Sequence, residues 1–593
     1  MAASMQYSLN LGTMKSAQPA RAASGKEVFR LAILADLSGR ASSGRLETGK
    51  DLAKRKPITV DVDNLDDVLR KLNIELTLPI GDDGGSVTIP IQSMDDFHPD
   101  QLYDNVELFS SLSGLRQRLK TTSTFAKAAQ EVQGWLVTSP AEAQPVAAEK
   151  PRGSAIPANG KLSDFAKLMG QATAKEAETP IADLLKQIVG PYVVAAKDPK
   201  ADKLIATVDQ AISQTMRKIL HHPDFQALEA VWRSVEFLVR RLETGTSLRI
   251  VLYDISAEEF ASDLSSTENL DETGLYSLLI EQPSLDAQQG SITAIVTTYS
   301  FEQTPPHADL LARVGRIASA APAAFLAAIG TSVIKKPKPE EIHPLVQSSW
   351  ETLQSLPEAG YIGLTVPRFM LRAPYGDKGE SIDRFEFEEF STQAGTRSIL
   401  YGSGAVLAGL LLGETFTQGG LKKMNLGSVM TAGDMPYFVF EDAEGEQVAL
   451  PCTERLLSVD LAAHVSGQRF MSILGIRGRP EVRLGSFQSL TGKPLAGPWA
   501  PIVFAPAPAA AAPAAPAPAA APSAPAPAAE QPAPAQAAEQ LAPAAEPAPA
   551  AAAVDAELDA LLASLNTPSE PSAAPADGGD QLDPGLAALL ADL

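Results

Sequence analysis

Residues 220–256 read LHHPDFQALEAVWRSVEFLVRRLETGTSLRIVLYDIS and are the most informative stretch of the chain. Pro223 suits the first turn of a helix, and apolar residues then recur at helical spacing up to Leu242. Gly245 follows as a stop signal, and residues 248–253 form a short apolar run typical of a buried strand. The stretch therefore predicts a long helix that leads into a central strand, as in an α/β fold.

Composition limits the class of protein. The 593 residues give enough material for two or more domains, and the net charge of −22 argues against nucleic acid as a partner. Cys452 is the only cysteine, so an intrachain disulfide and a cysteine-based zinc site are excluded, as suits a reducing cytoplasm. The most apolar stretch, residues 404–413, is about half as long as a membrane span requires. We expect a soluble cytoplasmic protein without direct membrane insertion.

Upstream of the opening stretch, residues 28–137 form a block with its own strands and helices. Residues 28–36 predict a buried strand, and residues 56–72 predict a strand followed by a helix that Asp63 or Asn64 caps. Residues 74–80 and 86–92 have the period of two of paired strands, and residues 97–120 and 125–136 predict helices. Residues 1–27 are polar and predict disorder, whereas residues 138–160, rich in Pro, Ala and Gly, predict a flexible linker.

Downstream, residues 161–219 predict helices and residues 220–500 predict a larger α/β core. Strands are expected at residues 291–298, 323–329 and 361–366, and a helix at residues 310–320. Residues 385–390 (FEFEEF) alternate aromatic and acidic side chains, as a half-exposed strand does. The fold class expected for the whole chain is α/β (α+β), with mixed sheets flanked by helices.

Residues 501–593 have a different composition. They consist largely of Ala and Pro, and from residue 505 on they contain eleven Asp and Glu but no Lys or Arg. Such a segment cannot bury a core, so we expect a disordered, semi-rigid tail. Two short leucine motifs at helical spacing interrupt it and predict segments that fold on a partner. Their residues are Leu558, Leu561, Leu562 and Leu565, and Leu586, Leu589, Leu590 and Leu593.

The opening stretch contains HHPDFQ near its start, then the short motifs WR and FLV, and then ETGT. In these motifs it resembles the large sheath subunit of bacterial type VI secretion systems (TssC or VipB). Further points of resemblance lie at Pro367, Arg368, Arg372, Pro374, Tyr375, Gly376, Phe385, Phe387, Glu388, Tyr401, Gly402, Ala405, Leu450, Pro451, Thr453 and Glu454. The family usually continues with a C-terminal helical block, and we expect this chain to lack it.

Residues 28–125 resemble the other sheath subunit, the small one (TssB or VipA). The positions that carry the resemblance are Ala35, Asp36, Ser38, Gly39, Arg40, Arg55, Lys56, Pro57, Ile58, Asp63, Asn64, Asp96, Phe97 and Pro99. The chain therefore looks like a natural fusion of the two sheath subunits. The resemblance implies a contractile-sheath fold in the bacterial cytoplasm, and it implies self-association into rings or a helical polymer. The other implied partners are the inner-tube protein, the baseplate, a ClpV-type AAA+ unfoldase and, as a further possibility, separate sheath subunits.

No residue pattern predicts an active site, a cofactor or a metal centre. His221, His222 and Asp224 suit a helix cap better than an ion, since neighbouring helical side chains point about 100° apart. Residues 485–494 lack the spacing of a phosphate loop, and the glycines around Ser403 are too close for a nucleophile elbow. Cys452 is expected to be a buried, inert thiol.

One apolar helix face, made by Leu162, Phe165, Leu168 and Met169, follows the expected linker. Resemblance to sheath large subunits implies that it binds the unfoldase as a helix in a groove, and the alternative is a helix docked on its own domain. For the whole chain we predict a non-enzymatic sheath component that polymerises around the inner tube and contracts to expel it. The alternative is an accessory sheath-like protein that caps, templates or tethers the sheath or baseplate through its acidic tail.

Overall fold

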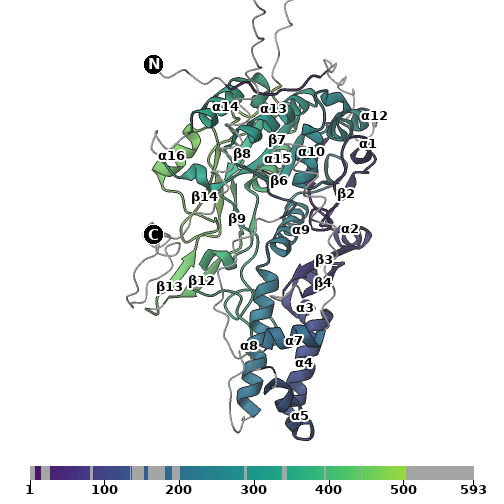
Figure 1. The fold of residues 1–593 in the computed structure, drawn as a ribbon. Helices are drawn as coiled ribbons and strands as arrows, with labels where there is room; N and C mark the ends of the chain where they lie inside the picture. The colour runs from purple at the N-terminus through teal and green to yellow at the C-terminus, as the bar shows by residue number, and fades with distance from the viewer. Residues whose placement is uncertain are drawn as a thin grey trace, which may run out of the picture. The chain divides into compact units, whose positions relative to one another are not determined.

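The computed structural model describes residues 7–14, 27–80, 85–133, 135, 152–157, 181–189, 201–285, 290–336, 343–392, 395–442 and 444–501. Within these ranges the fold is α/β, with mixed sheets flanked by helices, as predicted (Figure 1). Its centre is a nine-stranded sheet of order β11-β15-β14-β8-β7-β6-β1-β5-β2. In chain order these strands are β1 (Phe29–Ala35), β2 (Ile58–Val60), β5 (Leu248–Asp254), β6 (Ala294–Phe301), β7 (Ala324–Ile329), β8 (Ile362–Val366), β11 (Thr431–Ala432), β14 (Met471–Gly475) and β15 (Val482–Leu484).

Strand β1 comes from the N-terminal block but lies between two strands of the later block. It pairs in parallel with β5 along its whole length, from Phe29 opposite Leu248 to Ala35 opposite Asp254. On its other side it pairs in parallel with the first half of β6. All residues of β1 are buried, as expected for a parallel strand covered on both faces. The two blocks, whose boundaries remain a prediction, therefore contribute to one sheet.

Helices cover both faces of the sheet. One face packs against α9 (Pro223–Arg241) and α15 (Gly404–Gly419), and Leu31 and Ile33 of β1 belong to that cluster. The other face packs against α10 (Ala257–Ser265), α13 (Pro305–Ala320) and α14 (Pro344–Ser355), together with Ala32 and Leu34. The alternation of β1 side chains between the two clusters follows from the period of two of a strand. Among the described helices, none is long and apolar enough to cross a membrane.

A group of elements from the N-terminal block and from residues 181–220 lies outside the nine-stranded sheet. Figure 1 shows α4, α5, α7 and α8 gathered at one end of the ribbon, and helix α4 packs on both α5 and α8. The elements of this group, in chain order, are α2 (Leu65–Leu72), β3 (Ile74–Pro79), β4 (Ser86–Ile91), α3 (Pro99–Asn105), α4 (Glu107–Lys120), α5 (Thr122–Gln133), α7 (Ile181–Val189) and α8 (Ala201–Leu220). Strands β3 and β4 pair only with each other among the described strands, and their residues alternate between buried and exposed as predicted.

The remaining described elements are short. The two-residue strands β9 (Phe369–Met370) and β10 (Tyr401–Gly402) pair with each other, as do β12 (Phe438–Glu441) and β13 (Gln447–Leu450). The short helices are α1 (Gly49–Leu52), α11 (Gly274–Tyr276), α12 (Gln282–Leu285) and α16 (Val459–Gly467). The aromatic rings of Phe438 and Phe440 on the β12–β13 hairpin pack against Phe390.

The opening stretch folds as predicted. His222 caps helix α9 by accepting a hydrogen bond from the Asp224 amide at 3.2 Å, and Pro223 stands in the first turn. The indole Nε1 of Trp232 donates to the carbonyl oxygen of Leu37 at 2.9 Å. Helix α9 is therefore fastened directly to the turn that follows β1, and Trp232 and Phe225 are fully buried anchors. Ser256 begins α10 with a capping box to Glu259.

Several boundaries differ from the prediction for identifiable reasons. Helix α13 begins at Pro305 rather than at residue 310, because proline suits the first turn of a helix. Strand β6 lies three residues later than expected. The helix expected over residues 97–120 is broken at Val106 into α3 and α4. Residues 385–390 are not a strand, because their backbone follows the ion pair of Glu389 and the ring packing of Phe390 instead of a neighbouring strand.

Two segments that we expected to be unstructured are partly ordered. Within residues 1–27, residues 7–14 lie against α13 and the loop before α11: Thr13 forms a parallel bridge with Asn269, and the Tyr7 hydroxyl donates to Asp309 at 2.7 Å. Within residues 138–160, residues 152–157 lie against β6, where Ala155 bridges Ser300. Composition underestimates such segments because backbone pairing with the core needs no hydrophobic pattern.

We predict that Ile33→Ala in β1 destabilises both blocks together. Ile33 is 1 % exposed, and the cavity left by truncation should lower the free energy of unfolding by about 2–5 kcal/mol. Unfolding in urea can be monitored by tryptophan fluorescence and by circular dichroism. Because β1 lies in the shared sheet, the two unfolding curves should shift together to lower urea concentration. Val62→Ala is the control. The Val62 side chain lies in the same block and is 55 % exposed, so this substitution should leave the unfolding curves unchanged. A shift confined to the signal of the N-terminal block would contradict the shared sheet.

Candidate functional site

The candidate site lies at the carboxyl ends of β1 and β5, where the two blocks meet. In parallel α/β sheets this edge is where functional side chains gather. At the end of β5, Asp254 accepts hydrogen bonds from the amides of Leu37 at 2.8 Å and Ser38 at 3.1 Å, and from the Ser38 hydroxyl at 2.6 Å. A carboxylate of the later block thus holds the turn that follows β1.

Asp36, directly after β1, organises the same turn from the inside. Its carboxylate accepts hydrogen bonds from the amides of Arg40 at 2.6 Å and Ala41 at 3.0 Å. Burial, and after it the nearby charge of Asp254, raise the pKa of Asp36 to about 7, against the effect of these two amides. Burial also raises the pKa of Asp254. The turn therefore contains a carboxyl group that changes charge near neutral pH.

Glu259 of α10 is the ionic centre of the junction. Its fully buried carboxylate receives the Arg40 Nε at 3.0 and 3.1 Å and the Arg55 Nη1 at 2.8 Å, with Arg55 Nη2 also paired to it. Both arginines belong to the N-terminal block and the glutamate to the later one. Glu47, whose side chain is about half exposed, completes the charge balance with Arg40 and Arg55. Without Glu259, the two largely buried guanidinium groups would keep only the half-exposed Glu47 as an ionic partner, so this carboxylate helps to fix how the blocks meet.

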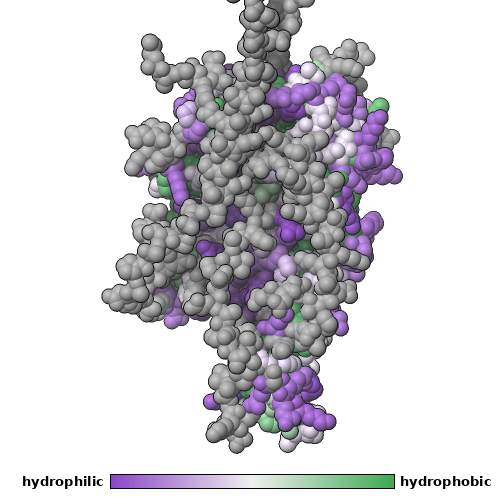
Figure 2. Space-filling model, in the orientation of Figure 1, coloured by the Kyte–Doolittle hydropathy of each residue, from purple (hydrophilic) through white to green (hydrophobic). Residues whose placement is uncertain are grey.

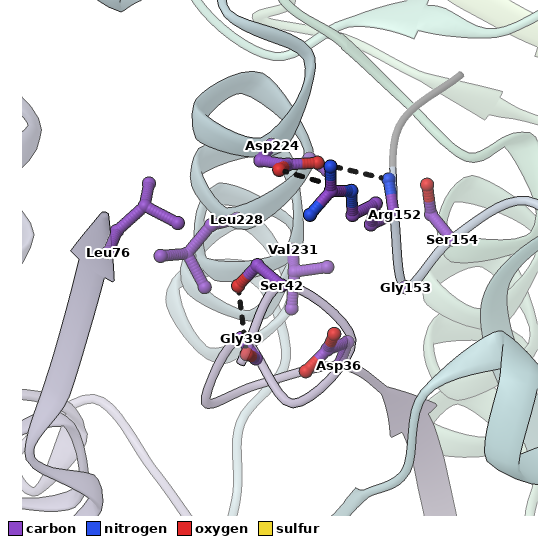
Figure 3. Close-up of a pocket in the computed structure, with 11 residues that line it drawn as sticks. Asp36, Gly39, Ser42, Leu76, Arg152, Gly153, Ser154, Asp224, Leu228 and Val231 are labelled. Atoms are coloured by element: carbon purple, nitrogen blue, oxygen red, sulfur yellow. Dashed lines mark hydrogen bonds and ion pairs between the residues drawn. The ribbon is translucent and has the colours of Figure 1, made fainter. Parts of the chain in front are cut away.

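A short pocket beside Asp36 is closed by residues 152–157. Figure 3 shows Asp36, Gly39 and Ser42 on one side of it, Leu228 and Val231 of α9 on another, and Arg152 and Gly153 across from them. The Arg152 amide donates to Asp224 at 3.2 Å, and its guanidinium lies 3.8 Å from the same carboxylate. The pocket thus lies where three parts of the chain pack together, and it is not an open cleft.

A second buried ion network holds α9 against the loop before β10. The Arg372 guanidinium bonds Glu229 at 2.7 and 3.1 Å and Glu389 at 2.7 and 3.1 Å. It also lies 4.1 Å from the ring centroid of Tyr375. Arg372 lowers the pKa of Glu389 to about 2 against the opposing effect of burial, so this carboxylate stays ionised. Arg233, whose Nε lies 3.5 Å from Glu229, adds a second positive charge, so two arginines face two carboxylates here.

The residues weighed as chemical candidates have structural roles in the described part of the chain. His222 is a helix cap, as expected. Ser403 caps α15 by accepting a hydrogen bond from the Ala405 amide at 3.3 Å, a role that the sequence did not predict. Cys452 is buried, and burial raises the pKa of its thiol to about 11, as expected for an inert group. Among the described residues, no three His, Cys, Asp or Glu side chains are placed to share a metal ion.

The predicted partner-binding residues lie outside the described residues. These are Leu162, Phe165, Leu168 and Met169, and the tail leucines Leu558, Leu561, Leu562, Leu565, Leu586, Leu589, Leu590 and Leu593. Their roles therefore stay predictions.

Sequence reasoning missed the charged junction. Asp36, Arg40 and Arg55 were noted only as points of resemblance, and the acceptor Glu259 was not singled out at all. One usable signal was present: Glu259 stands three residues after Ser256, the spacing of a capping box, at the carboxyl end of a predicted strand. Its pairing with arginines about 200 residues earlier carries no local signature.

The comparisons with known proteins agree with this architecture. Residues 202–491 match the family model VipB, described as EvpB/VC_A0108, tail sheath N-terminal domain. Residues 19–139 match the family model described as Type VI secretion system, VipA, VC_A0107 or Hcp2. The type VI secretion system sheath protein TssC1 of Pseudomonas aeruginosa is 27% identical over 339 residues, which cover 53% of this chain and 68% of that protein.

The fold and the junction define a structural protein whose two blocks share one sheet. The chain belongs to the sheath proteins of type VI secretion systems and joins their small-subunit and large-subunit families in one polypeptide. Membership of these families indicates a structural, non-enzymatic role.

Asp36→Asn should reduce the pH dependence of stability. The pKa of Asp36 is about 7 in the fold, against 3.8 for an ordinary aspartate, so the folded chain holds its proton more tightly than the unfolded chain. The stability that this proton contributes is fully present below pH 4 and is lost as pH rises through 7, by about 4 kcal/mol at most. The Asn variant has no proton to lose in this range, so its stability should change much less with pH, although its single oxygen can accept from only one of the two amides in the present geometry.

Urea unfolding at about pH 5 and about pH 8 measures this difference. Asp67→Asn is the control, because that side chain is 57% exposed in an ion pair with Arg70. Equal pH dependence in wild type and Asp36→Asn would show that Asp36 is ionised throughout this range.

Proposed function

We propose that the protein is a building unit of a type VI secretion contractile sheath, which polymerises around the inner tube in the bacterial cytoplasm and contracts to expel it. The observation that carries the proposal is the position of β1. The strand of the small-subunit region stands in the middle of the large-subunit sheet, paired on both sides. One chain therefore supplies both sheath components already joined, as a polymer repeat requires.

Contacts between copies would use strand edges rather than a broad apolar face. Among the described residues, the large hydrophobic side chains that are exposed are the scattered Val62, Leu285 and Val459. The described residues on the face in Figure 2 are mostly hydrophilic. The sheet ends in the short strands β2 and β11, whose outer edges pair with no other described strand. Strand addition at such edges couples chains through backbone hydrogen bonds, and contraction is then a switch between two packings of the same rigid units.

The proposal needs no hydrolysis within this chain. Energy for expulsion would be stored when the extended lattice assembles and released when the lattice contracts. The inner-tube protein, the baseplate, a ClpV-type unfoldase and separate sheath subunits are the partners that this role implies.

The accessory role is the second candidate, and the composition of the tail favours it. The segment after residue 505 is acidic and rich in Ala and Pro, with two leucine motifs suited to docking on a partner. In that role the protein would cap, template or tether a sheath or baseplate without forming the full polymer itself.

Electron microscopy of the purified full chain separates the two roles. If the chain is a sheath unit, negative-stain images should show tubes or stacked rings. A variant lacking residues 505–593 should still form them, because the shared sheet lies upstream. Monodisperse particles over a wide range of protein concentration and salt would contradict the sheath proposal. Loss of the polymer on removing the tail would show that the tail itself makes contacts between copies, contrary to both roles.

The helix face at Leu162, Phe165, Leu168 and Met169 is proposed as the contact for the unfoldase. Replacing Phe165 or Leu168 with Asp should weaken binding of a purified ClpV-type unfoldase by at least about tenfold, because a charge would enter an apolar groove. Fluorescence anisotropy with the full chain measures the affinity. Ser163→Asp, at a neutral position outside the predicted face, is the matched control because it also adds one negative charge. Unchanged affinity in Phe165→Asp and Leu168→Asp would contradict the contact.

A further inference from the structure

Residues 152–157, here called the strap, occupy a strand position in the sheet. The Ser300 amide donates to the Ser154 carbonyl oxygen at 2.9 Å, and the Ile156 amide donates to the Ser300 carbonyl oxygen at 3.2 Å. Ser300 pairs with β7 on its other side, so the strap stands on the side of β6 that β1 occupies. Strand β1 pairs with β6 only as far as Thr297. The strap therefore takes over the edge of β6 where β1 ends.

The backbone of the strap is bonded from several directions at once. The Ala257 amide, at the start of α10, donates to the Gly153 carbonyl oxygen at 2.9 Å, and the Gly153 amide donates to Glu258 at 3.0 Å. His307 Nε2 lies 3.1 Å from the carbonyl oxygen of Pro157. Ile156 is 6 % exposed and lies in the cluster under α10 and α13. Backbone pairing with one buried anchor side chain is how a groove recognises an extended peptide.

Gly153 gives this groove its selectivity. Its φ of +85° is a conformation that side-chain-bearing residues rarely adopt. A Cβ atom at this position would lie 2.8 Å from the Asp36 Cβ and closer still to a carboxylate oxygen of Asp36 (Figure 3). Only glycine can therefore cross the end of β1 at this point.

We propose that the end of β1, the edge of β6 and the start of α10 form a peptide-binding groove whose ligand is the extended segment Arg-Gly-Ser-Ala-Ile. Its occupant is residues 152–156 of the same chain, between the two sheath regions. By filling the groove the strap locks β1 into the sheet of its own chain, so the connection between the regions acts as a clasp. The clasp acts within one chain and does not depend on polymerisation.

Limited proteolysis of the full chain tests the clasp. The Arg152 side chain is 54% exposed, but its amide is bonded to Asp224, so trypsin can cut the Arg152–Gly153 bond only when the strap opens. In Gly153→Ala the rate of this cut, measured by mass spectrometry, should rise at least about tenfold, which corresponds to ~1.4 kcal/mol of lost docking. Rates are normalised to those of the matching unstructured peptides, because the substitution adjoins the cut bond.

Gly245→Ala is the matched control, since no heavy atom lies within 4 Å of the added Cβ and the backbone there does not require glycine. It should be cut at Arg152 as slowly as the wild type. A normalised rate in Gly153→Ala equal to that of the wild type would overturn the proposal, because a passive linker is indifferent to this substitution.

A second measurement tests recognition of the peptide itself. In a full chain whose strap is replaced by Gly-Ser repeats, a labelled peptide spanning residues 150–159 should bind in fluorescence anisotropy. The same peptide with Gly153→Ala should bind at least about tenfold more weakly. Circular dichroism establishes that the replaced chain is folded. Equal binding of the two peptides, or no binding to the folded chain, would overturn the proposal, and if the replaced chain does not fold, the proteolysis result decides.

Discussion

The parallel pairing of β1 with β5 and β6 is the interaction on which the rest of the structure depends. It joins residues that are more than 200 positions apart through backbone hydrogen bonds that are buried on both faces. A buried strand cannot leave its place without exposing unpaired amide and carbonyl groups, and each such group carries a large desolvation cost. The small-subunit region is therefore anchored inside the large-subunit sheet by its strand β1.

The charged groups at the end of β1 give this pairing its register. Asp254 accepts the amides of Leu37 and Ser38, while Glu259 takes two guanidinium groups from the N-terminal block. Buried ion pairs add little net stability, but a wrongly placed partner leaves a buried charge unsatisfied. We interpret the network as a constraint that allows only one arrangement of the two regions. Such uniqueness is what a repeating lattice needs from its building unit.

Helix α15 illustrates how close packing supports the same sheet. Two of its glycines face the strands, and a Cβ on the first, Gly404, would lie 2.9 Å from the Thr365 hydroxyl on β8. Gly409 approaches Val296 of β6 in the same way, with a Cβ 2.7 Å from a valine methyl. The close approach of helix to sheet explains the glycines at positions 404 and 409. Ser403 caps the helix by accepting a hydrogen bond from the Ala405 amide.

Sequence by itself determined the local elements and the family: helix α9 with its proline and cap, strand β5, the alternating β3 and β4, and the two sheath resemblances. Those features can be predicted from short-range periodicity and from motifs a few residues long. Tertiary structure alone decided that β1 lies between β5 and β6 and that Arg40 and Arg55 share Glu259. It also decided that residues 152–157 occupy a strand position, although their composition suggested a linker. The physical reason is that strand order and ion pairing depend on groups far apart in the chain, whose meeting leaves no periodic trace in the sequence around either one.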